Sequence, residues 1–71
     1  MLSEAGAGLA RADRSIADAE RSIRHLRDIV PRIAAQGYPT GQVEDQIEMM
    51  MQMLSHLKTQ RWHIEGMLGQ P

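Results

Sequence analysis

The feature that most constrains this chain is a pair of apolar stripes whose members recur every three or four residues. The first stripe consists of Leu9, Ala12, Ile16, Ala19, Ile23, Leu26, Val30 and Ile33. The second consists of Val43, Ile47, Met50, Leu54, Leu57, Arg61, Ile64 and Leu68. Such spacing keeps one side of an α-helix facing a partner helix, as in coiled coils. The chain is therefore predicted to be all-α, an antiparallel two-helix hairpin.

The segment between the stripes sets the bounds of the predicted elements. A single domain, 1–71, is expected to consist of a frayed segment over 1–8, helix over about 9–36, a turn at 37–40 and helix over about 41–68. Fraying is expected because Gly6 and Gly8 each cost a helix roughly 1 kcal/mol relative to alanine. Pro31 falls on the side away from the stripe, so the first helix should continue through it with a bend.

The turn carries signals for the end of one helix and the start of the next. Gly37 suits the left-handed position after a helix, and Tyr38 would then cover Ile33 in a Schellman motif. Thr40 is expected to cap the second helix, its hydroxyl accepting a hydrogen bond from an amide two or three residues on. So short a connection makes the helices antiparallel neighbours. The predicted pairs are Val43 with Ile33, Ile47 with Val30, Leu54 with Ile23, and Leu68 with Leu9.

Size and composition bound the classes of function. A chain of 71 residues has room for one small core, and it has no cysteine to staple that core with disulfides. The net charge is −1, so no overall field attracts nucleic acid or an anionic membrane. The chain starts without a basic, apolar leader and has no run long enough to span a membrane. We expect a soluble protein of the reducing cytoplasm.

The second helix has a further apolar stripe that the hairpin itself does not use. With the neighbouring Trp62, the predicted interface residues are Met49, Met53, His56, Gln60, His63 and Met67. A contiguous exposed apolar surface usually marks an interface. The simplest solution is a second copy, which makes a homodimeric four-helix bundle; a higher homo-oligomer or another helical protein is the alternative.

Arg61 occupies a position in the second stripe where an apolar residue is expected. Its stem can be buried while its guanidinium reaches Asp13 or Glu20 on the first helix. A polar residue in such a seam fixes the register of the helices, so these three residues are predicted to set it. Binding of an anion by Arg61 is the alternative.

The sequence contains no motif for catalysis, for a metal site or for a cofactor. His56 and His63 lie two turns apart, roughly 10 Å along a helix, which is too far to share a metal ion. No serine or threonine has a histidine and a carboxylate arranged around it, and two helices offer no deep pocket. We therefore expect no enzyme activity, no metal site and no cofactor.

Arginines along the first helix allow a second interpretation. Arg14, Arg21, Arg24 and Arg27 are the candidates for contact with an anion or a nucleic acid, although acidic residues interleave with them. A solvated helix face is the preferred explanation of these arginines, and a specific acidic or phosphate partner is the alternative.

Several of these residues together resemble a group of short, uncharacterised helical-hairpin proteins of alphaproteobacteria. The resemblance rests on the run Ala12–Ala17 with Glu20 and Ile23, on Gly37 and Thr40, and on Glu44, Leu54, Leu57, Arg61 and Ile64. It covers most of residues 9–68 and implies a bacterial cytoplasmic hairpin in which Asp13, Arg14 and Arg61 matter together. It brings no known activity. Pro31, Pro39 and the run Met49–Met51 depart from the group's pattern.

The sequence thus predicts a non-catalytic, self-associating protein-interaction or regulatory module. Two alternatives are an RNA- or DNA-binding hairpin dimer and an adaptor that docks its second helix on a different protein.

Overall fold

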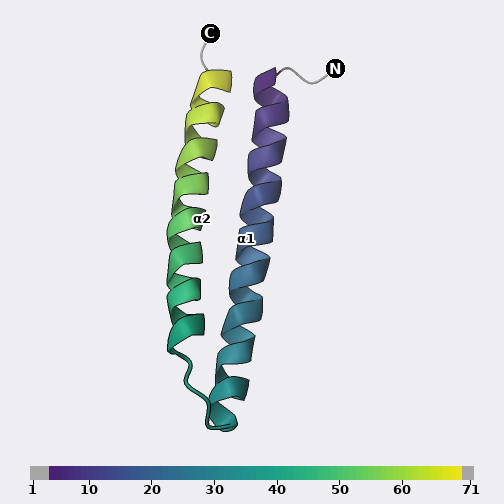
Figure 1. The fold of residues 1–71 in the computed structure, drawn as a ribbon. Coiled ribbons are helices and arrows are strands. Elements are labelled where there is room, and N and C mark those ends of the chain that lie inside the picture. Colours follow the sequence, from purple (N-terminus) through teal and green to yellow (C-terminus); the bar gives the residue numbers. More distant parts are fainter. Residues whose placement is uncertain (1–3, 70–71) are drawn as a thin grey trace.

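The computed structural model, which describes residues 4–69, consists of two long α-helices joined by a short loop (Figure 1). Helix α1 spans Glu4–Ala35 and continues through Pro31, and helix α2 spans Gly41–Leu68. The helices lie side by side and antiparallel, so the start of α1 and the end of α2 meet at the end opposite the loop. The predicted all-α antiparallel hairpin is confirmed.

The seam between the helices follows the two apolar stripes. Within α2 the residues that are not exposed are Val43, Ile47, Met50, Leu54, Leu57, Arg61 and Ile64. Every member of the first stripe is buried or half-buried, and among the described residues Ala19 and Ile23, with 6% and 5% of their surface exposed, form the buried core. Leu68 departs from the prediction, because it is the last residue of α2 and keeps 43% of its surface exposed.

The start of α1 differs from the expected fraying. The helix begins at Glu4, and residues 6–8 are half-buried against α2. A Cβ atom on Gly8 would lie 3.9 Å from the Cδ1 atom of Ile64, so the backbone of α1 passes close to α2 here. This packing offsets the low helix propensity of the two glycines. Residues 1–3 of the predicted frayed segment lie outside the described residues.

The end of α1 forms the predicted Schellman motif. Gly37 has a φ of 81°, and its N–H donates to the carbonyl of Ala34 at 3.0 Å. The N–H of Tyr38 donates to the carbonyl of Ile33 at 3.2 Å. These two bonds define the motif and satisfy two carbonyls at the helix end. The ring of Tyr38 is exposed, so it covers little of Ile33.

The start of α2 is capped differently from the prediction. Thr40 makes no side-chain bond to a backbone amide, because its backbone is already in the helical region, with φ −106° and ψ −1°. Capping by a side chain needs a more extended backbone. The hydroxyl of Thr40 instead donates to Oε1 of Glu44 at 3.1 Å, and its carbonyl accepts the N–H of Glu44 at 3.0 Å.

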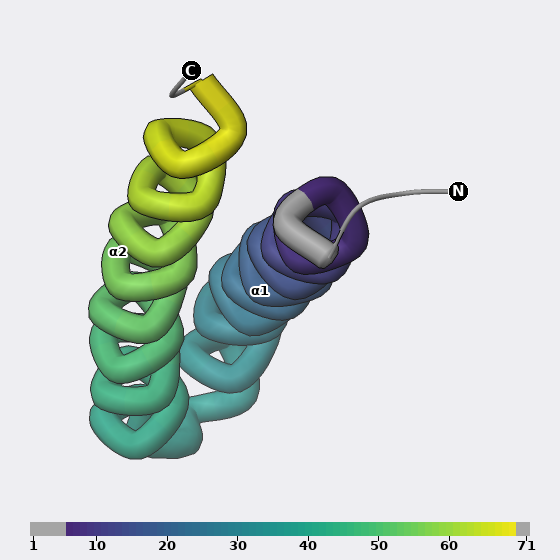
Figure 2. The backbone as a smooth tube through the Cα atoms, turned by 90° about the horizontal axis from the view of Figure 1, so that it is seen from above, coloured from purple at the N-terminus to yellow at the C-terminus, as the bar shows by residue number. Residues whose placement is uncertain are grey.

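The hairpin is a single layer of two helices. It extends over 57 × 20 × 12 Å, so its smallest dimension is about the diameter of one helix. Its radius of gyration is 16.5 Å, against about 11 Å for a compact domain of this length. Figure 2 looks along the hairpin from its open end and shows no third element against either face of the described residues. Folded domains normally bury their apolar faces between two layers.

Candidate functional site

The two broad faces of the hairpin differ in charge. A shallow groove between the helices marks one face and is lined by Glu20, Ile23, Arg24, Arg27, Met51 and Leu54. Successive residues of a helix are rotated by about 100°, which assigns the other residues to one face or the other. We call the face with the groove the charged face. It consists of Asp13, Ala17, Glu20, Arg24 and Arg27 of α1 and Glu44, Glu48, Met51, Ser55, Lys58, Trp62 and Glu65 of α2.

The opposite face, which we call the uncharged face, consists of polar but neutral and apolar residues. These are Ser15, Ser22, Leu26, Ile29 and Ile33 of α1 and Gln42, Gln46, Met49, Met53, Gln60 and Met67 of α2. Arg11 lies 18 residues, or five full turns, before Ile29 and so projects in the same direction, as a charged residue of this face, and Asp18 lies at the margin of the face on α1. The charged residues of α2 project instead toward the charged face or the outer edge. The methionines of the uncharged face are exposed to solvent, with exposed fractions of 69% for Met49, 55% for Met53 and 60% for Met67.

The predicted interface residues fall mostly on this uncharged face. Gln60 projects from it beside the methionines, and its Nε2 lies 3.3 Å from Nε2 of His56 at the outer edge. His63 lies at the same edge. Trp62 does not belong with them, because it is two residues from Gln60 and thus about 200° away around the helix. It is exposed on the charged face, with its ring edge-on to His63 at 5.1 Å between centroids.

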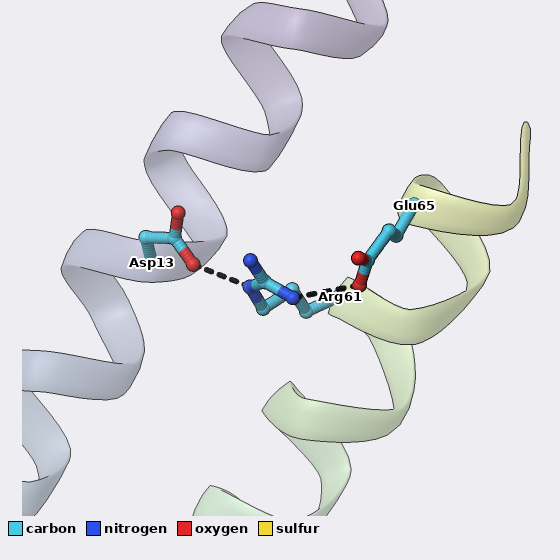
Figure 3. A network of polar contacts seen from close by, with 3 residues as sticks. All are labelled: Asp13, Arg61 and Glu65. Carbon is cyan, nitrogen blue, oxygen red and sulfur yellow. Dashed lines mark hydrogen bonds and ion pairs between the residues drawn. The ribbon is translucent and has the colours of Figure 1, made fainter. Parts of the chain in front are cut away.

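Arg61 makes a polar link between the helices in the half of the hairpin toward the open end (Figure 3). Its Nε donates to Oδ1 of Asp13, and its Nη1 donates to Oε2 of Glu65 at 2.8 Å. The hydrogen bond to Asp13, followed by the charge of Asp13, raises the pKa of Arg61 above its ordinary value. The predicted pairing of Arg61 with Asp13 is therefore present.

The second predicted partner of Arg61 lies elsewhere. Glu20 lines the groove about two helical turns farther toward the loop, and Glu65, one turn along α2, takes its place. The sequence contained this signal, since residues four apart on a helix are neighbours. Both carboxylates lie on the charged-face side of Arg61, so they draw its guanidinium to that face and away from the uncharged one.

The role of Arg61 in setting the register is tested by Arg61→Leu. We expect the melting temperature of this variant to stay level or rise, because leucine packs better in a half-exposed seam position than an ion pair does. Loss of a fixed register should appear as heterogeneity, with several species in sedimentation velocity in place of one. A marked fall in melting temperature with a single species would instead make Arg61 a stabilising residue without a role in specificity.

The four candidate arginines do not form one cationic patch. Arg14 and Arg27 project about 140° apart around α1. Arg21 pairs with Asp18 at 3.1 Å, and Nη2 of Arg27 lies 3.4 Å from the sulfur of Met51. Arg24 lines the groove together with Glu20 and Arg27. Acidic side chains therefore lie among the arginines on every side.

The described residues give little support for a metal site or a membrane-spanning helix. No group of three or more His, Asp or Glu side chains within residues 4–69 is placed to hold a metal ion. Neither described helix is both long and apolar enough to cross a membrane. No family model matches the chain, and no curated protein or solved structure matches it.

Proposed function

We propose that this chain is a non-catalytic, self-associating interaction module whose working form is a homodimeric four-helix bundle. The observation that carries the proposal is the single-layer architecture, in which Ala19 and Ile23 are the buried apolar residues of the described part of the chain and neither is fully enclosed. A core this small gives a chain little stability of its own. A second layer supplied by another copy would bury the faces that the hairpin leaves open.

The accessible surface gives the size of the missing layer. The chain exposes 5660 Å², whereas a compact monomer of 8.0 kDa exposes about 4,450 Å². The excess is about 1,200 Å² per chain. A standard interface buries about 800 Å² per partner and obligate homodimers bury more, so a dimer of this hairpin accounts for the excess.

The chemistry of the exposed surface supports a protein partner. Core regions of homodimer interfaces are depleted in charge and enriched in methionine and aromatic residues. Met49, Met53 and Met67 meet this description, and an unbranched thioether adapts its shape to a partner with little strain. A bacterial, cytoplasmic setting is part of the proposal and rests on the absence of cysteine and on the resemblance noted for residues 9–68.

The dependence of thermal unfolding on protein concentration tests the proposal. Dissociation on dilution exposes a layer of low stability, so the melting temperature of a dimer should rise by about 5 °C per tenfold increase in concentration. Circular dichroism over a hundredfold range of concentration measures it. A melting temperature that does not change with concentration would contradict self-association.

A further inference from the structure

We propose that Met51 is a site of reversible oxidation and that Arg27 binds the oxygen of its sulfoxide, so that oxidation ties α1 to α2. The oxidant is hydrogen peroxide. The inference concerns a contact within one chain, and it stands whether or not the chain self-associates.

The side chains of Met51 and Arg27 meet across the groove of the charged face. Nη2 of Arg27 lies 3.4 Å from the sulfur of Met51, and both residues line the groove. Met51 keeps 46% of its surface exposed, so a small oxidant can reach its side chain. Arg61 and Asp13 make another link between the helices, about 21 Å nearer the open end.

A thioether is a poor partner for a guanidinium. Its sulfur is a weak hydrogen-bond acceptor, whereas the N–H groups of arginine are donors of a charged group. The oxygen of a sulfoxide carries partial negative charge, so the same donor would make a stronger, charge-assisted hydrogen bond to it. N–H···O bonds span about 2.9 Å between heavy atoms, so the exposed Arg27 has to move outward to admit the oxygen.

Arg27 is available for this role because no carboxylate of the described residues holds it. Within residues 4–69 it makes no ion pair. Glu20 also lines the groove, but it lies one turn from Arg24 and two turns from Arg27. Glu48, three residues before Met51 on α2, is rotated about 60° farther from the seam. A sulfoxide at Met51 would therefore have little competition for the guanidinium.

Oxidation of the sulfur by hydrogen peroxide is a two-electron transfer of oxygen. A lone pair of the sulfur attacks one peroxide oxygen, and an S–O bond forms as the O–O bond breaks. The leaving hydroxide takes up the proton of the transferred hydroxyl. The thioether is thus oxidised to a sulfoxide, and the peroxide is reduced to one molecule of water. Methionine sulfoxide reductases reverse the change.

The position of Met51 makes the effect of oxidation opposite to the usual one. A sulfoxide inside a core disrupts packing, because it places a polar oxygen among apolar side chains. Met50, which is half-buried in the seam, would have this effect. At Met51 the oxygen would lie at the rim of the groove, in contact with water and with Arg27. Oxidation of Met51 is therefore expected to stabilise the hairpin in the half toward the loop.

The change in melting temperature on oxidation tests the proposal when it is compared between variants. The native protein, Met51→Leu, Arg27→Ala and the double variant are melted by circular dichroism before and after mild treatment with hydrogen peroxide, at one protein concentration. Tandem mass spectrometry verifies that each remaining methionine is oxidised to the same extent in all four proteins. The other methionines then contribute equally, so the differences isolate Met51.

Oxidation of Met51 should contribute a rise of about 3 °C where Arg27 is present, taken as the difference between the native protein and Met51→Leu. The same difference should be zero or negative in the Arg27→Ala background. Arg24→Ala is the matched control, because Arg24 lines the same groove but is rotated about 60° outward from Arg27, and it should keep the rise.

Three results would overturn the proposal. The contribution of Met51 could be the same with and without Arg27, it could be a fall in the native protein, or Met51 could stay unoxidised while Met49 and Met53 are oxidised. A monomer mass in sedimentation would contradict the proposed self-association and leave this test unchanged, because both partners belong to one chain.

Discussion

Leu54→Asp is expected to abolish the folded hairpin. Leu54 lies in the middle of the seam, in the position predicted to pair with Ile23, which is buried. Replacing a buried leucine by a small residue costs about 2–5 kcal/mol, and an unpaired charge in the seam adds to that. The free energy of unfolding of a small domain is about 5 kcal/mol, so the expected loss of stability is comparable with all of it. Far-ultraviolet circular dichroism should show most of the helix lost at every protein concentration.

The control for Leu54→Asp is Ser55→Asp. It adds the same charge one residue later, at an exposed position of the charged face. Surface substitutions of this kind change stability by about 0.5 kcal/mol or less, so this variant should keep its helix. If Leu54→Asp kept as much helix as Ser55→Asp, the seam would not be where the two stripes place it.

Met53→Asp is expected to dissociate the protein before it unfolds it. Met53 is more than half exposed in the single hairpin and projects from the uncharged face, so the aspartate does not disturb the seam. In a dimer each copy would bury one such charge, and the mass should fall to that of a single chain at tens of micromolar. At low temperature the variant should keep clearly more helix than Leu54→Asp. Sedimentation and circular dichroism on the same samples measure both effects.

Trp62→Asp is the matched control for Met53→Asp. Trp62 is a large apolar residue on the same helix and is more exposed than Met53, at 69% against 55%, but it projects from the charged face. Trp62→Asp should have the same mass in sedimentation as the unmodified protein. Dissociation by Trp62→Asp, with Met53→Asp unchanged, would show that the groove side is the docking surface.

The sequence predicted the parts of this structure that depend on local periodicity. Every member of the first stripe and all but Leu68 of the second lie in the seam, because a 3.6-residue helix leaves no other place for residues at that spacing. Gly37 predicted the end of α1 for an equally local reason, since its positive φ is one that glycine adopts without strain.

The errors arose where a longer-range contact or the backbone outweighed a local preference. Gly8 lies in helix because α1 passes close to Ile64 there, a contact that the propensity of glycine does not include. Thr40 does not cap through its hydroxyl because its backbone is already helical. The rotation of about 100° per residue places Trp62 on the other side of α2 from Gln60, and its part in an interface stays a prediction. Sequence patterns place residues on a helix more reliably than they identify what covers them.

The most direct test of self-association is sedimentation equilibrium of the unmodified chain at tens of micromolar. The excess surface of the single layer and its exposed methionines predict a mass of twice 8.0 kDa, or about 16 kDa. A mass of 8.0 kDa at that concentration, with the helix content intact, would contradict it, because the uncharged face would then be stable in water without a second copy.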